Sequence, residues 1–309
     1  MHEQLDSILR QSRKPDAIVA YDDCSTDKTW DILQDFEKTS SIPVKIFRNA
    51  TQLGVTKNFE TAVRALDTDI ICLSDQDDIW FPDKLSKLSS IFEHSPETAL
   101  IYTNAALVDG NGNYLGSSLF EELEVTRKEV REIMRGEAFN VLCRRNVITG
   151  ATTAFRRDLL SLALPFPETH VHDHWLALIG AAAARVHYLH EPTIKYRLHG
   201  KNVIGVRKPS RMEKCKEIWW YLHKKKRGWA KDQVKSRTEF LRRVESHPQI
   251  PKYIVSHFQD AINFSKFRAT LPDSVFTRSP AVLWQVARGR YRRFEYAWRR
   301  EAFLDLFNK

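Results

Sequence analysis

The chain has 309 residues, of which 42% are hydrophobic and 28% charged, as in an ordinary globular protein. Its four cysteines form no CxxC pair, which argues against a zinc ribbon or a disulfide framework and favours a reducing compartment. We expect no secretory leader, and the longest apolar run, near residues 176–184, is shorter than the roughly 20 residues that span a bilayer.

The net charge of +9 conceals two parts of opposite balance. Residues 201–309 hold 26 Lys and Arg against 10 Asp and Glu, whereas residues 1–200 hold 22 against 29. A change of this size indicates different partners for the two parts. Gly205, Pro209 and Ser210 interrupt the pattern, so we expect one domain over residues 1–205 and a basic, mainly helical region over residues 206–309.

Helices and strands are expected to alternate along the acidic part. The spacing of apolar residues predicts helices over residues 3–10, 29–37, 57–66 and 82–93. Short apolar runs predict strands over residues 16–21, 44–47, 70–73 and 100–102. This βαβα order predicts an α/β fold with a mainly parallel sheet, in which ligands bind beyond the carboxyl ends of the strands.

Two acidic clusters directly follow predicted strands. Asp22 and Asp23 end the first strand, and Asp75, Asp77 and Asp78 follow the strand at 70–73. A single Asp before a helix is ordinarily a cap, but three carboxylates within four residues exceed that need and would raise one another's pKa. Hard oxygen ligands beside an open cleft suit Mg²⁺ or Mn²⁺ bound together with a diphosphate, so we favour metal binding over capping.

Six segments resemble, in order, the motifs of family 2 glycosyltransferases, which are inverting enzymes of the GT-A fold that use nucleotide-diphosphate sugars. The segments are YDDCSTD at 21–27, NATQLGVTKNF at 49–59, DQDDIW at 75–80, TGATTAFRR at 149–157, HDHWL at 172–176 and YRLHGKN at 196–202. The resemblance covers residues 1–205 and is strongest to rhamnosyltransferase-like polysaccharide enzymes. The family opens with a strand before a helix like residues 3–9, so the chain is expected to lack the family's first β-strand.

The resemblance implies a role for each matching residue. Asp77 is the expected direct metal ligand, with Asp75 and His199 as further ligands. Asp173 is the expected general base, which takes the acceptor's proton while the divalent ion stabilises the leaving diphosphate. Asp23 is expected to accept a hydrogen bond from the nucleoside base. The expected donor-binding residues are Asp22, Asp23, Asn49, Gly54, Lys57, Asn58, Asp75, Asp78, Gly150 and Lys201. The expected acceptor cleft contains His172, His174 and Trp175.

The sequence HVHDH at 170–174 leaves a second interpretation open. His170, His172 and His174 could hold one zinc ion, as in a zinc-dependent hydrolase. The HxHxDH pattern of dinuclear metallo-hydrolases needs one residue more than is present, so we favour the base motif. A third interpretation is a degenerate, truncated glycosyltransferase fold that serves only as a binding module.

The basic region suggests a surface for anionic lipid. Five residues fall at helical spacing on one face with arginines beside them: Leu283, Ala287, Tyr291, Phe294 and Trp298. This pattern is typical of an interfacial helix, although the same aromatic residues could instead pack on the catalytic core beneath a basic surface. Binding of nucleic acid is not expected, because no recognition motif is present and the acidic cleft would repel phosphate.

The expected function combines these inferences. We expect a metal-dependent inverting transferase with a UDP-, dTDP- or GDP-linked donor and a glycan or lipid-linked glycan acceptor, as in O-antigen or capsule biosynthesis. The expected location is cytoplasmic and peripheral, at the inner face of the cell membrane.

Overall fold

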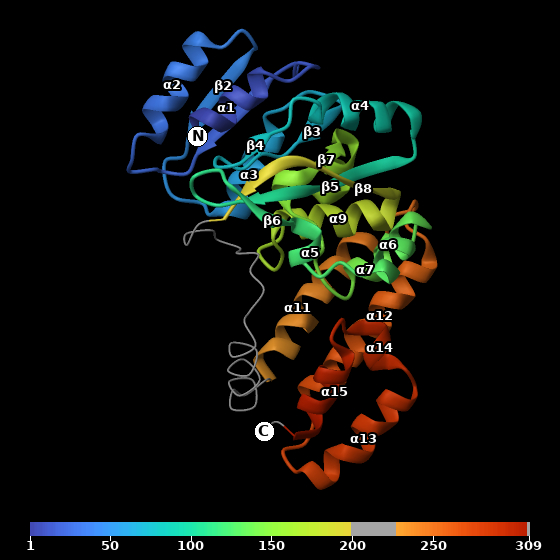
Figure 1. Ribbon diagram of the computed structural model, residues 1–309. Helices are drawn as coiled ribbons and strands as arrows, with labels where there is room; N and C mark the ends of the chain where they lie inside the picture. Colours follow the sequence, from blue (N-terminus) through green and yellow to red (C-terminus); the bar gives the residue numbers. More distant parts are fainter. Residues whose placement is uncertain (199–226, 308–309) are drawn as a thin grey trace. The chain divides into compact units, whose positions relative to one another are not determined.

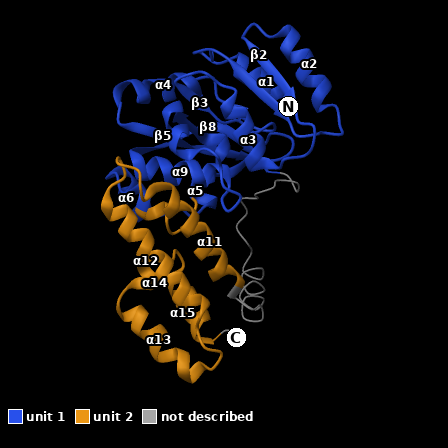
Figure 2. Ribbon diagram, turned by 180° about the vertical axis from the view of Figure 1, so that it is seen from behind, with its two compact units in different colours: residues 1–139, 147–206 blue, residues 140–146, 207–309 orange. Residues whose placement is uncertain are grey.

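The computed structural model describes residues 1–198 and 227–307. The predicted contacts His199 and Lys201 therefore lie outside the described residues. The chain divides into two compact units, one of Met1–Phe139 with Val147–Val206 and one of Asn140–Asn146 with Arg207–Lys309 (Figure 2). Residues 140–146, which we placed in the first domain, cluster with the second unit.

The first unit contains two sheets (Figure 1). β1 (Ile18–Asp22) and β2 (Val44–Arg48) form a parallel pair in which Asp22 lies opposite Arg48. The larger sheet has the order β3–β7–β5–β8–β4, with β6 paired to β5. Its strands are β3 (Ile70–Cys72), β4 (Ile79–Trp80), β5 (Thr98–Val108), β6 (Tyr114–Ser118), β7 (Thr153–Arg156) and β8 (Arg185–Arg197).

The larger sheet is mixed in direction. β5 pairs in parallel with β8 along its length, whereas β7 runs antiparallel to both of its neighbours, β3 and β5. β7, which was not among the predicted strands, thus lies between β3 and β5. Ten of the eleven residues of β5 are buried, because helices cover both faces of this central strand.

Helices α4 (Lys84–His94) and α9 (His172–Ala183) lie on opposite faces of the larger sheet, as Figure 1 shows. Phe92 of α4 belongs to a buried cluster with Ile101 of β5. Gly180 of α9 approaches the neighbouring residue Leu100, whose Cβ would lie 3.4 Å from a Cβ placed on the glycine. Adjacent residues of a strand point to opposite faces, so β5 packs on both helices.

The other helices of this part of the chain are mostly short. Three of them, together with α4, match the predicted helices to within two residues at each end: α1 (His2–Leu9), α2 (Thr29–Thr39) and α3 (Val55–Arg64). The remaining four are α5 (Leu119–Glu122), α6 (Arg127–Met134), α7 (Ala138–Leu142) and α8 (Leu160–Ala163). α1 contributes Ile8 to a core cluster that contains Trp80 and Tyr196.

The described residues of the second unit from 227 onward are helical. Their helices are α11 (Arg227–Val244), α12 (Lys252–Ala269), α13 (Val275–Ala287), α14 (Arg290–Phe294) and α15 (Trp298–Phe307). The predicted single apolar face from Leu283 to Trp298 is wrong, because Gly289, in the left-handed region at φ +70°, separates α13 from α14. Tyr291 and Phe294 are buried in the core of the unit, whereas Leu283 is exposed.

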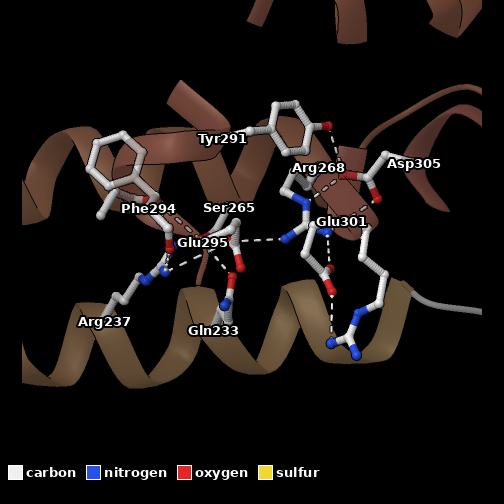
Figure 3. Close-up of polar contacts among 11 residues, drawn as sticks. Gln233, Arg237, Ser265, Arg268, Tyr291, Phe294, Glu295, Glu301 and Asp305 are labelled. Carbon is white, nitrogen blue, oxygen red and sulfur yellow. Dashed lines mark hydrogen bonds and ion pairs between the residues drawn. The ribbon is translucent and has the colours of Figure 1, made fainter. Parts of the chain in front are cut away.

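A buried ionic network joins the helices of the second unit (Figure 3). The guanidinium of Arg268, on α12, pairs with Glu295 at 2.9 Å and with Glu301 at 2.8 Å, and its Nε pairs with Asp305. The Tyr291 hydroxyl donates to the same Asp305 carboxylate at 2.7 Å. Removing one member of such a network leaves a buried charge uncompensated, which typically costs about 3–5 kcal/mol.

Within residues 1–198 and 227–307, no helix is both long enough and apolar enough to cross a bilayer.

Candidate active site

The loop after β3 holds the three carboxylates that the sequence singled out. The Asp78 carboxylate is almost completely buried; its Oδ1 accepts a hydrogen bond from the Arg197 backbone N–H at 3.1 Å, and its Oδ2 has no hydrogen-bond partner. Burial raises the pKa of Asp78 to about 8, and the nearby Asp75 charge adds to the effect. α4 begins at Lys84 with Asp83 as its N-cap, so Asp78 is not a helix cap.

Asp75 is electrostatically linked to the residue that we predicted as the general base. Burial, together with the charges of Asp77 and Asp173, raises the pKa of Asp75 to about 7. Since Asp173 lies on α9, the fold brings the end of β3 and the first turn of α9 close enough for their carboxylates to interact. Asp75, one of the predicted metal ligands, therefore lies near Asp173, the predicted base.

A buried lysine, which sequence reasoning missed, lies beneath this acidic loop. Lys84 is fully buried, its Nζ donates to the Ala151 carbonyl at 2.9 Å, and it lies 3.9 Å from the centre of the Trp80 ring. Burial lowers its pKa to about 8, although Asp78 and Asp75 oppose that shift. The sequence signal that could have revealed this buried lysine is its spacing. Lys84 precedes the core residues Leu88 and Phe92 by four and eight positions, and this spacing puts all three on the inward face of α4.

Arg197, at the end of β8, fastens the acidic loop to its surroundings. Its Nε donates to the Asp77 carbonyl at 3.1 Å and its Nη1 donates to the Gly110 carbonyl at 2.7 Å. Its Nη2 pairs with Glu3 of α1 at 2.6 Å. One side chain thus connects the loop after β3 with α1 and with the turn between β5 and β6.

Asp173 lies in the first turn of α9, where its carboxylate is held by backbone groups. Its Oδ2 accepts a hydrogen bond from the Gly150 N–H at 3.1 Å, and its Oδ1 accepts from the N–H of His174. The N-cap of α9 is Val171, so Asp173 does not occupy the capping position. A Cβ on Gly150 would lie 2.8 Å from Nε2 of His172, which explains why a glycine fits here.

The histidines of 170–174 do not form a zinc site. His172 is buried and stacks on Phe59 with ring centres 4.0 Å apart, and neither of its nitrogens has a hydrogen-bond partner. Burial lowers the pKa of His172 to about 4 and that of His170 to about 3, with the charge of His174 adding to the latter shift. The stacking of His172 on Phe59 holds its ring in the core, and in the part of the chain that the structure describes no three His, Cys, Asp or Glu side chains are grouped to hold a metal, so the three histidines are not arranged as a zinc site.

The predicted acceptor cleft also needs correction. Trp175 is fully buried and its Nε1 donates to the Ala163 carbonyl at 2.8 Å, so its ring belongs to the core of the unit. Since His172 is buried as well, only His174 of the three predicted residues is partly exposed.

The loop between β2 and α3 closes on the end of β1 through side-chain hydrogen bonds. Asp23 accepts from the Asn49 amide at 2.8 Å and from the backbone N–H groups of Leu53 and Gly54 at 2.7 and 2.8 Å. Burial alone would raise the pKa of Asp23, but these hydrogen bonds outweigh it and hold the pKa below its usual value. The Asn49 amide also donates to Asn58 at 2.8 Å, so the two asparagines of the predicted motif hold each other.

Two further residues that we predicted to bind the donor instead form ion pairs and hydrogen bonds with other residues of the protein. Asp22 pairs with Arg48 across the β1–β2 register at 3.0 Å. Lys57 pairs with Glu60 at 2.8 Å and donates to the Phe166 carbonyl at 2.6 Å. Both side chains therefore support the loops around the site.

Residues 1–162 match the sequence profile of Glycosyl transferase family 2. The chain therefore belongs to this family and is a glycosyltransferase, as the motifs predicted.

Individual relatives have low sequence identity to this chain, but their alignments are longer than the 162 residues that match the family. The dTDP-rhamnosyl transferase RfbG of Shigella flexneri is 26% identical over 211 residues, which are 66% of this chain and 70% of the relative. The putative teichuronic acid biosynthesis glycosyltransferase TuaG of Bacillus subtilis is 25% identical over 253 residues, 77% of this chain and 92% of the relative. The predicted similarity to rhamnosyltransferases is thus confirmed.

The fold is also that of solved glycosyltransferases. The mannosyltransferase PcManGT from Pyrobaculum calidifontis, solved with GDP-Man and Mn²⁺, superposes with a TM-score of 0.51 at 15% identity, covering 99% of this chain and 80% of that one. At this identity the comparison establishes the fold alone. It confirms the predicted α/β fold of the GT-A class.

Proposed function

We propose that this chain transfers a sugar, with inversion, from a nucleotide-diphosphate donor to a hydroxyl of a glycan or lipid-linked glycan in surface polysaccharide biosynthesis. The observation that supports the proposal most is the electrostatic interaction of Asp75 with both Asp77 and Asp173, the residues that we assign to the metal and to the base. The names of RfbG and TuaG support a sugar nucleotide donor and a polysaccharide product.

The residues present fit a divalent cation. Asp75 and Asp77 offer the hard oxygen ligands that Mg²⁺ and Mn²⁺ prefer, and burial together with the neighbouring carboxylates raises the pKa of Asp75 and of Asp78, an effect that a bound cation would oppose. Two carboxylates leave coordination positions for diphosphate oxygens, and His199 is a further candidate ligand. When bound, the ion would neutralise charge on the departing diphosphate.

In the proposed reaction, Asp173 accepts the proton of the acceptor hydroxyl as that oxygen attacks the anomeric carbon. Gly150 orients the base through its N–H and lies along the wall of the donor-sugar pocket, where Asp78 orients a sugar hydroxyl. Asp23 accepts from the nucleoside base.

The other donor-side residues act mainly through the loops that they hold. Asn49, Gly54 and Asn58 shape the nucleotide loop, and Asp22 and Lys57 support it through Arg48 and Glu60. Lys201, which lies outside the described residues, is a further candidate for a diphosphate contact. The enzyme would work at the inner face of the cytoplasmic membrane, where lipid-linked acceptors are exposed.

Calorimetry with UDP-, dTDP- and GDP-sugars, each with and without Mn²⁺, tests the proposal. We expect one donor to bind in a Mn²⁺-dependent manner and the Asp77→Asn variant to lose that dependence, because an amide is a poorer ligand for a hard cation. Unchanged binding in the variant would exclude Asp77 as a ligand. Donor binding without any transfer or hydrolysis would instead support the non-catalytic binding module.

A further inference from the structure

Helix α13 of the second unit presents an apolar face to solvent. The exposed residues on this face recur at helical spacing: Phe276, Pro280, Leu283, Trp284 and Ala287. Phe276 is 91% exposed, and Leu283 and Trp284 are 56% and 59% exposed. An amphipathic helix of a globular protein normally turns such a stripe toward the core, so an outward apolar stripe indicates a binding surface.

The opposite face of α13 anchors the helix to its own unit. Val282 is completely buried in the core cluster that includes Tyr291 and Phe294. Arg278 is also buried, and its Nε donates to the Leu306 carbonyl of α15 at 3.0 Å. The buried face alone packs α13 on its unit, so the apolar residues of the outer face are not needed for that packing. The core contacts hold this outer face in a fixed orientation.

The charged residues of α13 and α14 are all arginines, of which Arg278 is buried. Residues 275–294, which span α13 and α14, contain no Asp or Glu and hold Arg278, Arg288, Arg290, Arg292 and Arg293. The exposed guanidinium of Arg288 lies 5.2 Å from the centre of the Trp284 ring, at the edge of the stripe. Phe303 and Phe307 of α15, which packs on α13, are a second exposed aromatic pair, with ring centres 4.8 Å apart.

We propose that the outer face of α13 inserts into the interfacial region of an anionic lipid bilayer, with the helix parallel to the membrane plane. Exposed Phe, Leu and Trp on one helix with arginines in the same segment are the arrangement that interfacial helices use, because the apolar side chains enter the acyl boundary while the cations meet anionic headgroups. A second copy of the chain fits this face poorly, since an isologous contact would bring the two sets of arginines together. The inference deepens the proposed membrane location but does not depend on sugar transfer.

Sedimentation of the full chain with vesicles tests this inference. We expect binding to phosphatidylcholine vesicles that contain about one-third phosphatidylglycerol, weaker binding to phosphatidylcholine alone, and partial release by salt. The Phe276→Ser/Trp284→Ser double variant should bind at least about tenfold more weakly, since two large side chains lose their burial in lipid. The matched control is Tyr253→Ser, which removes a 62% exposed aromatic from α12 of the same unit and should leave binding unchanged.

Three results would overturn the inference: equal binding by the double variant, equal loss in Tyr253→Ser, or no preference for anionic lipid. Analytical ultracentrifugation adds a further check, because a dimer that the double variant abolishes would assign the face to a second copy. The Asp77→Asn variant should bind vesicles like the unmodified chain. Loss of donor binding with vesicle binding retained would therefore count only against the proposed catalytic function, and the reverse result only against the membrane surface.

Discussion

The backbone N–H of Gly150 donates a hydrogen bond to the Asp173 carboxylate, with 3.1 Å between N and Oδ2. This contact joins the segment before β7 to the first turn of α9, and it fixes the orientation of the carboxylate that we assign as the general base. A base must point at the proton that it removes, so this one hydrogen bond connects the fold with the proposed chemistry.

The Asp173→Asn variant separates a catalytic from a structural role. Asparagine keeps one oxygen that can accept from Gly150, while its NH2 group cannot accept from the His174 N–H, so we expect a small loss of melting temperature with donor binding retained. Turnover should fall by on the order of 10²–10⁴-fold, because an amide cannot accept the acceptor's proton. His174→Gln serves as the comparison: a larger loss there than in Asp173→Asn would move the base assignment to His174.

Replacing Gly150 by alanine should disturb the same site through a steric clash. The added Cβ would lie 2.8 Å from Nε2 of His172, and that ring is buried against Phe59 and has little room to move. We expect a loss of stability of about 1–3 kcal/mol, measured by denaturant unfolding, together with reduced turnover. Gly110→Ala is the matched control, since a Cβ there meets no atom within 4 Å and the backbone is not in the left-handed region. Equal stability of the two variants would show that the His172 contact relaxes freely.

Replacing the buried Lys84 by methionine should weaken metal-dependent donor binding. The Lys84 charge lowers the pKa of both Asp75 and Asp78, so its removal should raise both values. Protons then compete better with the cation, and we expect the pH profile of Mn²⁺-dependent binding to move to higher pH. The control is Lys87→Met on the same helix, which removes only the surface pairs with Asp83 and Glu191. A pH profile that is the same in both variants would contradict the assignment.

The buried His257 of α12 should make the second unit less stable in acid. Burial lowers its pKa to about 4, and the charges of Arg293 and Arg237 act in the same direction. Between the unfolded pKa of about 6.5 and the folded value, the unfolded state binds more protons, so stability falls as the pH falls through this window. When the pH is lowered from 7.5 to 5, the free energy of unfolding of the unmodified chain should fall by about 1–2 kcal/mol more than that of the His257→Phe variant. A pH-independent difference, measured by denaturant unfolding at both values, would show that His257 does not titrate in this way.

Local patterns predicted the first hundred residues well, because each helix and strand there depends on its own apolar spacing. The predicted helix at 29–37 and strand at 44–47, for example, correspond closely to α2 and β2. The acidic loops were also placed correctly at strand ends. These features follow from short-range sequence alone.

Contacts between distant segments could not be predicted in this way. The position of β7 between β3 and β5 depends on pairing between residues 70–72 and 154–156, which no periodicity reveals. The face that Tyr291 and Phe294 occupy depends on the break at Gly289, after which these two residues of the predicted stripe lie in the core while Leu283 and Ala287 stay exposed. Lys84 was overlooked because a lysine within an apolar spacing is ordinarily assigned to the surface.

The separation of β1 and β2 from the larger sheet has a consequence for ligand affinity. No backbone ladder joins these two strands to the larger sheet among the described residues, so local opening of the pair is opposed by side-chain contacts such as the packing of Ile18 of β1 against the core cluster that contains Trp80. Under the proposed function, the donor would touch both parts, with its base at Asp23 and its diphosphate near Asp77. Its apparent affinity would then be the intrinsic affinity multiplied by the fraction of molecules in which the two parts are already aligned. A change far from the nucleotide that stiffens this alignment would tighten donor binding without adding a single contact to the donor.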